Sequence, residues 1–146
     1  MEDPFPPASA DLATQLRTQT GQPLAIGEDV AGRWAFRDLC QRGTVDYARL
    51  DATTIGGITE FMRVAAVVSA WDVPVSPHIF PDIHLHCLAA IPNGFALEWT
   101  DPAAEIDVFH KLQRRQPVIE GGIATVSEEP GLGLEIDWDA VERYAL

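Results

Sequence analysis

Four ionisable residues of this sequence each follow a short apolar stretch, and a fifth lies one interval ahead of them. The residues are Glu2, Glu28, Asp51, His78 and Glu98, and successive members are 26, 23, 27 and 20 residues apart. Carboxylate oxygens are ligands that hard divalent cations such as Mg²⁺ prefer, and a histidine held by a carboxylate makes a tuned general base. A single polar residue at a strand end is commonly a turn former or a helix N-cap. Five of them at a repeating interval favour one shared site.

The apolar runs that precede these residues predict strands, and the stretches between the runs predict helices. We expect strands at residues 23–27, 45–50, 73–76 and 94–99. We expect helices at residues 33–42, 58–71 and 82–91. The clearest helix carries Ile58, Phe61, Met62, Ala65 and Ala66 at helical spacing, which predicts one apolar stripe.

Strands that alternate with helices predict an α/β fold with parallel strands. The repeating unit of about 25 residues suits a (β/α) barrel or a doubly wound sheet. The sequence contains neither the Gly-x-Gly-x-x-Gly nor the Walker A pattern, which favours the barrel over a nucleotide-binding sheet. In a barrel the carboxyl ends of the strands converge on one mouth, where active sites lie.

Five short motifs occur in order along residues 2–100. They are Glu2-Asp3-Pro4, Gly27-Glu28, Asp51 followed by Gly56-Gly57-Ile58-Thr59, Ser76-Pro77-His78, and Leu97-Glu98. In these motifs the sequence resembles the enolase superfamily, and specifically its mandelate racemase-like branch. The tail, with Glu120-Gly121-Gly122 and Pro130-Gly131-Leu132-Gly133, is similar to the C-terminal segment of that family.

The resemblance implies a role for each of the five residues. Glu2 and Glu28 match carboxylates that bind an essential Mg²⁺, which also holds the carboxylate of the substrate. His78 matches the base that removes the α-proton to form an enediolate, and Asp51 matches the carboxylate that orients this base. Glu98 matches an acid that hydrogen-bonds the substrate carboxylate as negative charge accumulates there.

The sequence also departs from the family pattern. The Lys-x-Lys base motif is absent, Lys111 is the only lysine, and a whole barrel needs about 250 residues. We therefore expect the C-terminal half of a TIM-type (β/α) barrel, from a truncated or fragmentary member that is inactive alone. Residues 1–146 would form a single partial barrel domain, with the strand-end sites in 2–100. The remaining segment, 101–146, would contain a loop or hairpin near 117–134 and a closing helix at 137–144.

The reaction expected of the parent enzyme is α-proton abstraction, ending either in dehydration of an acid sugar or in racemisation of a 2-hydroxy acid. Acid-sugar dehydration is slightly favoured because dehydratases are the larger population in this branch. One alternative is a non-catalytic remnant, or a half-barrel that pairs with another chain. Another is an amidohydrolase-type metal site at His84 and His86. On the predicted helix these two rings point about 200° apart, which argues against joint chelation.

Composition limits the partners of the chain. Asp and Glu number 22 against 10 Lys and Arg, a net charge of −12, which argues against nucleic acid or an anionic membrane. The N-terminus lacks the basic and apolar regions of a signal peptide, and Cys40 and Cys87 are expected to be buried free thiols. We therefore expect a cytoplasmic protein. The resemblance to the enolase superfamily implies a small carboxylate substrate and a homo-oligomer in the full-length form.

Overall fold

The strand positions in residues 2–94 form one parallel ladder whose spatial order is the order along the chain. The computed structural model describes residues 1–145. Strands β1 (Ala25–Ile26) and β2 (Tyr47–Ala48) pair in parallel. Isolated parallel bridges extend this pair on both sides, joining Glu2 to Ala25, Ala48 to Val75, and Val75 to Gly94. The prediction of consecutive parallel strands is confirmed.

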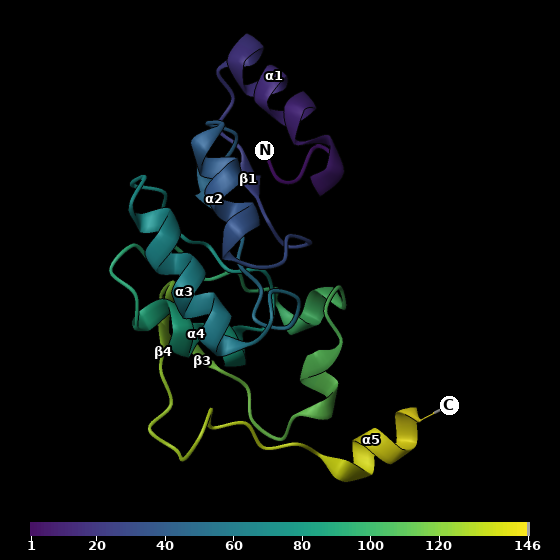
Figure 1. The fold of residues 1–146 in the computed structure, drawn as a ribbon. Helices are drawn as coiled ribbons and strands as arrows, with labels where there is room; N and C mark the ends of the chain where they lie inside the picture. Colours follow the sequence, from purple (N-terminus) through teal and green to yellow (C-terminus); the bar gives the residue numbers. More distant parts are fainter. Residues whose placement is uncertain (146) are drawn as a thin grey trace.

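A helix lies between each pair of successive strand positions, as in a (β/α) barrel (Figure 1). These helices are α1 (Ala10–Thr20), α2 (Arg33–Gln41), α3 (Ile58–Ser69) and α4 (Pro81–Ala89). The architecture is therefore α/β, with one part of a TIM-type barrel.

Helix α1 is an element that the hydrophobic pattern does not predict. Only Ala13 is buried among its residues, so a weak apolar stripe gives little helical signal. The helix ends at Gly21, whose φ of 69° lies in the left-handed region and whose N–H donates to the carbonyl of Arg17. That glycine is the clearest local sign of this helix in the sequence.

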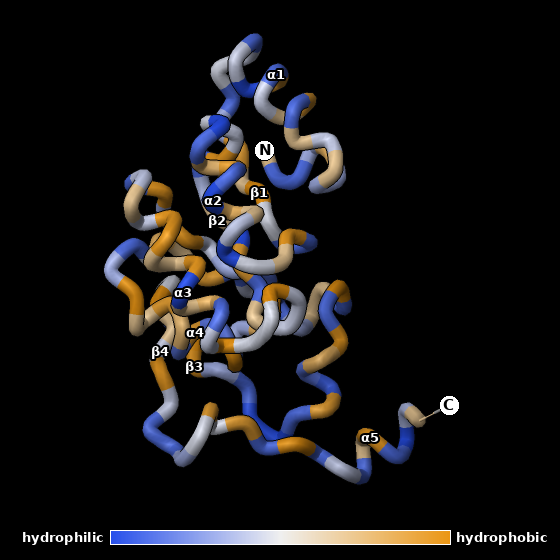
Figure 2. The backbone as a smooth tube through the Cα atoms, viewed as in Figure 1, coloured by the Kyte–Doolittle hydropathy of each residue, from blue (hydrophilic) through white to orange (hydrophobic). Residues whose placement is uncertain are grey.

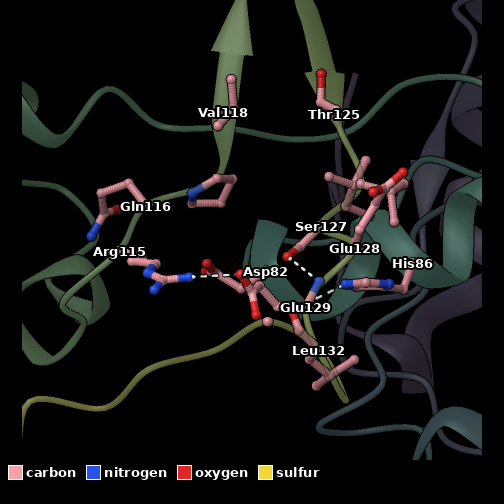
Figure 3. Close-up of a pocket in the computed structure, with 14 residues that line it drawn as sticks. Asp82, His86, Arg115, Gln116, Val118, Thr125, Ser127, Glu128, Glu129 and Leu132 are labelled. Carbon is pink, nitrogen blue, oxygen red and sulfur yellow. Dashed lines mark hydrogen bonds and ion pairs between the residues drawn. The ribbon is translucent and has the colours of Figure 1, made fainter.

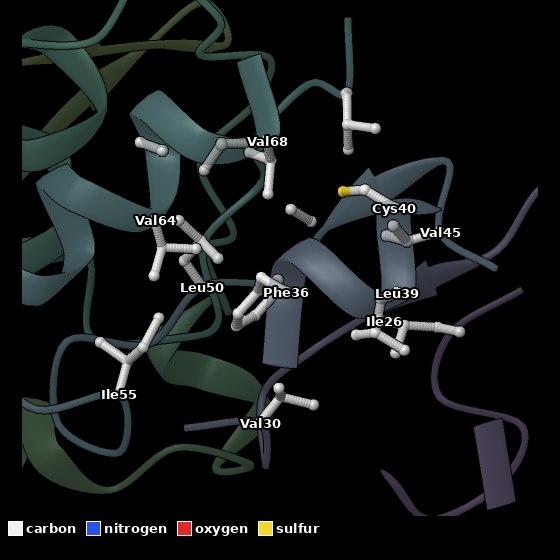
Figure 4. Packing of buried hydrophobic residues seen from close by; sticks show 14 of the residues in the cluster. Ile26, Val30, Phe36, Leu39, Cys40, Val45, Leu50, Ile55, Val64 and Val68 are labelled. Atoms are coloured by element: carbon white, nitrogen blue, oxygen red, sulfur yellow. The ribbon is translucent and has the colours of Figure 1, made fainter. Parts of the chain in front are cut away.

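The core lies between the ladder and helices α2 and α3 (Figure 4). Phe36 of α2 and Phe61 of α3 are both completely buried. The buried stripe of α3 continues through Val64, Ala65 and Val68. It differs from the predicted stripe because Ile58 and Ala66 are exposed and the helix is rotated toward Val64 and Val68.

Both cysteines are buried and free, as the sequence predicts. Burial raises the pKa of the Cys40 thiol to about 11, because the thiolate would lose its hydration. At neutral pH Cys40 is therefore an uncharged, unreactive core residue.

The last expected strand is much shorter in the structure than in the sequence-based prediction. Gly94 alone bridges to Val75, and Phe95 donates its N–H to the carbonyl of Val75. Strand 73–76 is likewise reduced to its bridge residue Val75. The position of Gly94 is the outer edge of the ladder, where pairing on one side supports only a short strand.

Beyond the ladder, the chain forms a hairpin and a short terminal helix. Antiparallel strands β3 (Val118–Glu120) and β4 (Ile123–Thr125) make the hairpin, and α5 (Trp138–Tyr144) begins after Asp137. The Asp137 carboxylate caps α5 by accepting hydrogen bonds from two backbone N–H groups. The remaining elements in residues 1–145 are the 3-10 helices η1 (Pro7–Ser9), η2 (Pro102–Ala104) and η3 (Phe109–Leu112).

The hydrophobic residues of the chain gather where the helices meet the ladder, and a second group lies on the hairpin (Figure 2). Val118 and Ile123 of this hairpin are more than half exposed. Across residues 1–145, no helix has both the length and the apolar character needed to cross a bilayer.

Candidate active site

Three of the five strand-end residues form a continuous row of polar side chains. Nδ1 of His78 lies 3.0 Å from Oδ2 of Asp51, and Nε2 of the same ring lies 3.5 Å from Oε2 of Glu28. Each residue follows a different position of the parallel ladder, so the barrel geometry brings them together.

Glu28 owes its position to the glycine before it. Gly27 has a φ of 139°, and a Cβ atom there would lie 2.6 Å from the ring of Phe36 and 2.8 Å from the carbonyl oxygen of Arg49. No larger residue fits between α2 and the neighbouring strand. The Gly-Glu pair therefore combines a tight backbone turn with a carboxylate directed to the strand ends.

Asp51 is buried and fully hydrogen-bonded. Its Oδ1 accepts from the N–H of Thr53 at 2.7 Å and from the Thr53 hydroxyl at 2.8 Å, while Oδ2 faces His78. Burial opposes ionisation, but the nearby His84 ring and the hydrogen bonds from Thr53 and His78 outweigh it and hold the pKa of Asp51 below its usual range. Asp51 is therefore a carboxylate at neutral pH.

An ionised Asp51 determines which nitrogen of His78 carries hydrogen. A carboxylate can only accept, so Nδ1 of His78 is the donor in the 3.0 Å contact. In the neutral ring this leaves the lone pair on Nε2, on the side of Glu28. The side chain of His78 is 25% exposed, so the ring is partly open to solvent.

The chain after His78 adopts an unusual backbone conformation. Ile79 and Phe80 have φ values of 31° and 42°, although neither is glycine. The N–H of Ile79 donates to Oε2 of Glu98 at 2.6 Å, which fixes this turn against the next strand end. Strained backbone of this kind is held by its surroundings and is concentrated at functional sites.

Arg49 is a central residue of this site that the sequence analysis does not single out. Its side chain is 6% exposed, and Nη2 lies 2.7 Å from both Oε1 of Glu2 and Oε2 of Glu98. Nη1 donates to the carbonyl of Pro77 at 3.3 Å. The available signal was an arginine two positions before Asp51, in the alternating strand set of Val45 and Tyr47.

Glu2 and Glu28 supply the carboxylate chemistry that Mg²⁺ prefers, together with their neighbour Asp3. Burial, and then repulsion from Glu28 and Glu2, raise the pKa of Asp3 to about 6, so negative charge is concentrated here. Among residues 1–145, however, no three Asp, Glu, His or Cys side chains are arranged to hold a metal ion. Glu2 is paired with Arg49 instead. The described residues therefore place carboxylates near the strand ends without completing a metal site among themselves.

His84 and His86, the pair considered for a transition-metal site, contact different segments. His84 is completely buried, and its ring nitrogens contact Ala52 and Ile79. Nε2 of His86 lies 3.1 Å from the carbonyl oxygen of Leu132. The two rings therefore hydrogen-bond separate backbone segments and do not face a common point.

A separate cavity of about 330 Å³ lies between α4 and residues 115–133 (Figure 3). None of Glu28, Asp51 and His78 lines it; among its lining residues, Asp82 accepts a hydrogen bond from Gln113 at 2.9 Å and Arg115 lies 3.4 Å from Glu129. The cavity is therefore distinct from the row of side chains around His78.

Known proteins resemble this chain along nearly its whole length. It is 32% identical over 149 residues to a D-xylonate dehydratase from Haloferax volcanii, covering 99% of this chain and 36% of that protein. An enolase from alpha pretobacterium bal199, crystallised with bound Mg, aligns with a TM-score of 0.87 at 31% identity, covering 97% of this chain and 38% of the other. An L-talarate dehydratase from Polaromonas sp. JS666, complexed with Mg and L-glucarate, aligns with a TM-score of 0.80 at 25% identity, covering 97% and 38%.

The chain thus spans little more than a third of the length of these relatives. The family model described as enolase C-terminal domain-like matches residues 1–140. The ladder of parallel strands, the strand-end residues and this match agree, and the chain belongs to the enolase C-terminal domain-like family.

Proposed function

We propose that this chain supplies the histidine side of the active site of an acid-sugar dehydratase. The observation that carries the proposal is the Asp51–His78 pair, which leaves a lone pair on Nε2 of the partly exposed His78 ring. The dehydratase names of the D-xylonate and L-talarate relatives support acid sugars as the substrate class. The full reaction requires groups beyond these residues, because the chain matches only 36% of the xylonate enzyme.

In the proposed reaction, Nε2 of His78 removes the α-proton of the substrate, and the electrons of the C–H bond form an enediolate. Asp51 stabilises the imidazolium that results, because its buried carboxylate lies 3.0 Å from Nδ1. The enediolate then expels the β-hydroxyl, which takes the proton from His78 and leaves as water. In the racemase alternative, a proton returns to the α-carbon and no bond to oxygen breaks.

Two other groups would act on the substrate carboxylate. Oε2 of Glu98 is occupied by Arg49 and Ile79, so Oε1 is the atom through which Glu98, acting as the acid, would hydrogen-bond the substrate carboxylate. Glu2 and Glu28, with further ligands, would hold Mg²⁺, whose positive charge neutralises the carboxylate as the α-proton leaves. Holding the ion with Glu2 requires this side chain to turn away from Arg49.

Complementation tests the proposal. The chain is mixed with the remaining N-terminal part of the Haloferax volcanii D-xylonate dehydratase, and 2-keto acid formation from D-xylonate, D-mannonate and L-glucarate is followed with Mg²⁺. We expect turnover only in the mixture, and a loss of at least about 100-fold for His78→Gln. His110→Gln, in the 3-10 helix η3, is the matched control and should retain activity. Equal rates for His78→Gln and the unchanged chain would refute the proposed base.

A half-barrel that pairs with another chain is the second candidate. The edge of the ladder at Gly94 is followed by Phe95 and Trp99, which are 64% and 44% exposed. Apolar side chains beside an open strand edge favour coverage by a further polypeptide. Sedimentation of the chain with and without the dehydratase fragment distinguishes the two: a stable complex without turnover supports pairing alone.

A further inference from the structure

His84 is the most deeply buried histidine of the described chain, and both ring nitrogens have hydrogen-bond partners. The N–H of Ala52 donates to Nε2 at 2.8 Å, and Nδ1 lies 2.6 Å from the carbonyl oxygen of Ile79. The ring also stacks on Phe61 of α3, with centroids 5.7 Å apart and planes 21° from parallel. The imidazole is therefore fixed in position and in orientation.

These partners permit one protonation state. A backbone N–H can only donate, so Nε2 of His84 carries a lone pair; a carbonyl can only accept, so Nδ1 carries the hydrogen. Oδ1 of Asp51 lies 3.4 Å from Nε2, but a nitrogen that accepts from Ala52 has no hydrogen to donate to Asp51. The contact between His84 and Asp51 is consequently not an ion pair, and the charge of Asp51 is left to interact with His78.

The two backbone partners of His84 each lie next to one member of the Asp51–His78 pair. Ala52 directly follows Asp51, and Ile79 directly follows His78. One buried ring thus connects the loop that carries the carboxylate to the loop that carries the base. The second loop contains the left-handed residues Ile79 and Phe80, which need such an external restraint.

We infer that His84, in its neutral Nδ1–H form, is a positioning residue that sets the Asp51–His78 pair by hydrogen-bonding the residue after each member. The catalytic meaning of this inference rests on the proposed function. Its structural content does not, because the tautomers of His84 and His78 are measurable without turnover.

The test uses the full chain labelled with ¹⁵N-histidine, whose ring nitrogens report by their shifts and long-range couplings which of them bears hydrogen. Four histidines give a readily assigned spectrum. We expect hydrogen on Nδ1 and none on Nε2 of His84, and hydrogen on Nδ1 of His78. A doubly protonated His84, or hydrogen on its Nε2, overturns the inference.

Two variants separate the two hydrogen bonds of His84. In His84→Gln the amide oxygen reaches the place of Nε2 and can still accept from Ala52. In His84→Asn the shorter amide retains the donor to Ile79 and loses the acceptor for Ala52. We expect His78 to remain a single tautomer in His84→Gln. In His84→Asn we expect a mixture of tautomers at His78, and exchange of the Ala52 amide that is faster by about tenfold or more.

His86→Gln is the matched control, because it removes another ring of α4 whose contact is with Leu132. It should leave the His78 signals unchanged. A folded His84→Asn protein with an unaltered His78 tautomer would show that His84 does not position the pair. If that variant does not fold, hydrogen on Nε2 of His84 in the unchanged chain, or an altered His78 tautomer in His84→Gln, still overturns the inference. Because no turnover is measured, failure here is distinguishable from failure of the complementation assay.

Discussion

Nη2 of Arg49 donates to Oε2 of Glu98 across 2.7 Å, from a guanidinium that is almost completely buried. The same nitrogen lies 2.7 Å from Oε1 of Glu2, at the opposite end of the parallel ladder. One cation thus joins the first and last strand positions of this part of the barrel. It also offsets negative charge in a chain that carries 12 more acidic than basic residues.

Replacing Arg49 with methionine should lower the free energy of unfolding. The variant loses the contacts to Glu2, Glu98 and the Pro77 carbonyl, but both carboxylates are partly exposed and can turn to solvent. We therefore expect a loss of about 1–2 kcal/mol, less than for a fully buried pair. Urea denaturation measures it as a lower midpoint at an unchanged slope. Arg37→Met, at an exposed pair with Asp38, is the control and should change stability by less than about 0.5 kcal/mol. Equal effects at the two sites would contradict the bridging role.

Replacing Gly27 with alanine should lower the stability of the fold far more than replacing Gly32 with alanine. Both glycines have positive φ, so both substitutions strain the backbone, but only at Gly27 would the new Cβ overlap the Phe36 ring and the Arg49 carbonyl. For Gly32→Ala we expect a cost of about 1–2 kcal/mol from the backbone alone. For Gly27→Ala we expect at least about 3 kcal/mol, or an insoluble protein. Thermal unfolding of the two variants side by side provides the comparison, and similar melting temperatures would be inconsistent with the clash.

Asp51→Asn should change how stability depends on acidity. The folded pKa of Asp51 lies below its unfolded value of about 3.9, so its contribution is present above about pH 4 and is lost as the pH falls through the folded pKa. The variant should be less stable by about 2 kcal/mol at pH 7, since an amide nitrogen would face the Nδ1–H of His78. The stability gap should shrink between pH 5 and pH 2. A gap that stays constant over this range would mean that Asp51 is not held as a carboxylate.

Asp3→Asn should raise the free energy of unfolding, whereas Asp51→Asn lowers it. Burial and the neighbouring Glu28 and Glu2 raise the folded pKa of Asp3 to about 6, so ionised Asp3 destabilises the fold increasingly from about pH 4 to pH 6. Asparagine imitates the protonated acid and tolerates the φ of 25° at this position. We expect the variant to gain about 1 kcal/mol over the unchanged chain at pH 7, after solvent screening, and little at pH 4. Unfolding is followed with a chelator present, and an advantage that does not grow with pH would be evidence against this explanation.

Much of the fold follows from local features of the sequence. The apolar runs and their spacing predict consecutive parallel strands, and the glycine before Glu28 marks a tight turn that the packed Phe36 ring requires. Element boundaries were less predictable: α1 has too few buried residues to give a helical stripe, and the strand at 94–99 shrinks to one bridge because it lies at an edge.

By itself the sequence determined the order of the ladder and the five strand-end residues, because the period of the βα unit is encoded locally along the chain. Only the tertiary structure decided which side chains meet: Arg49 with Glu2 and Glu98, and His84 with the backbone beside Asp51 and His78. These contacts join separate βα units, so they depend on loop directions and on positive φ values such as that of Ile79, which no spacing along the chain encodes.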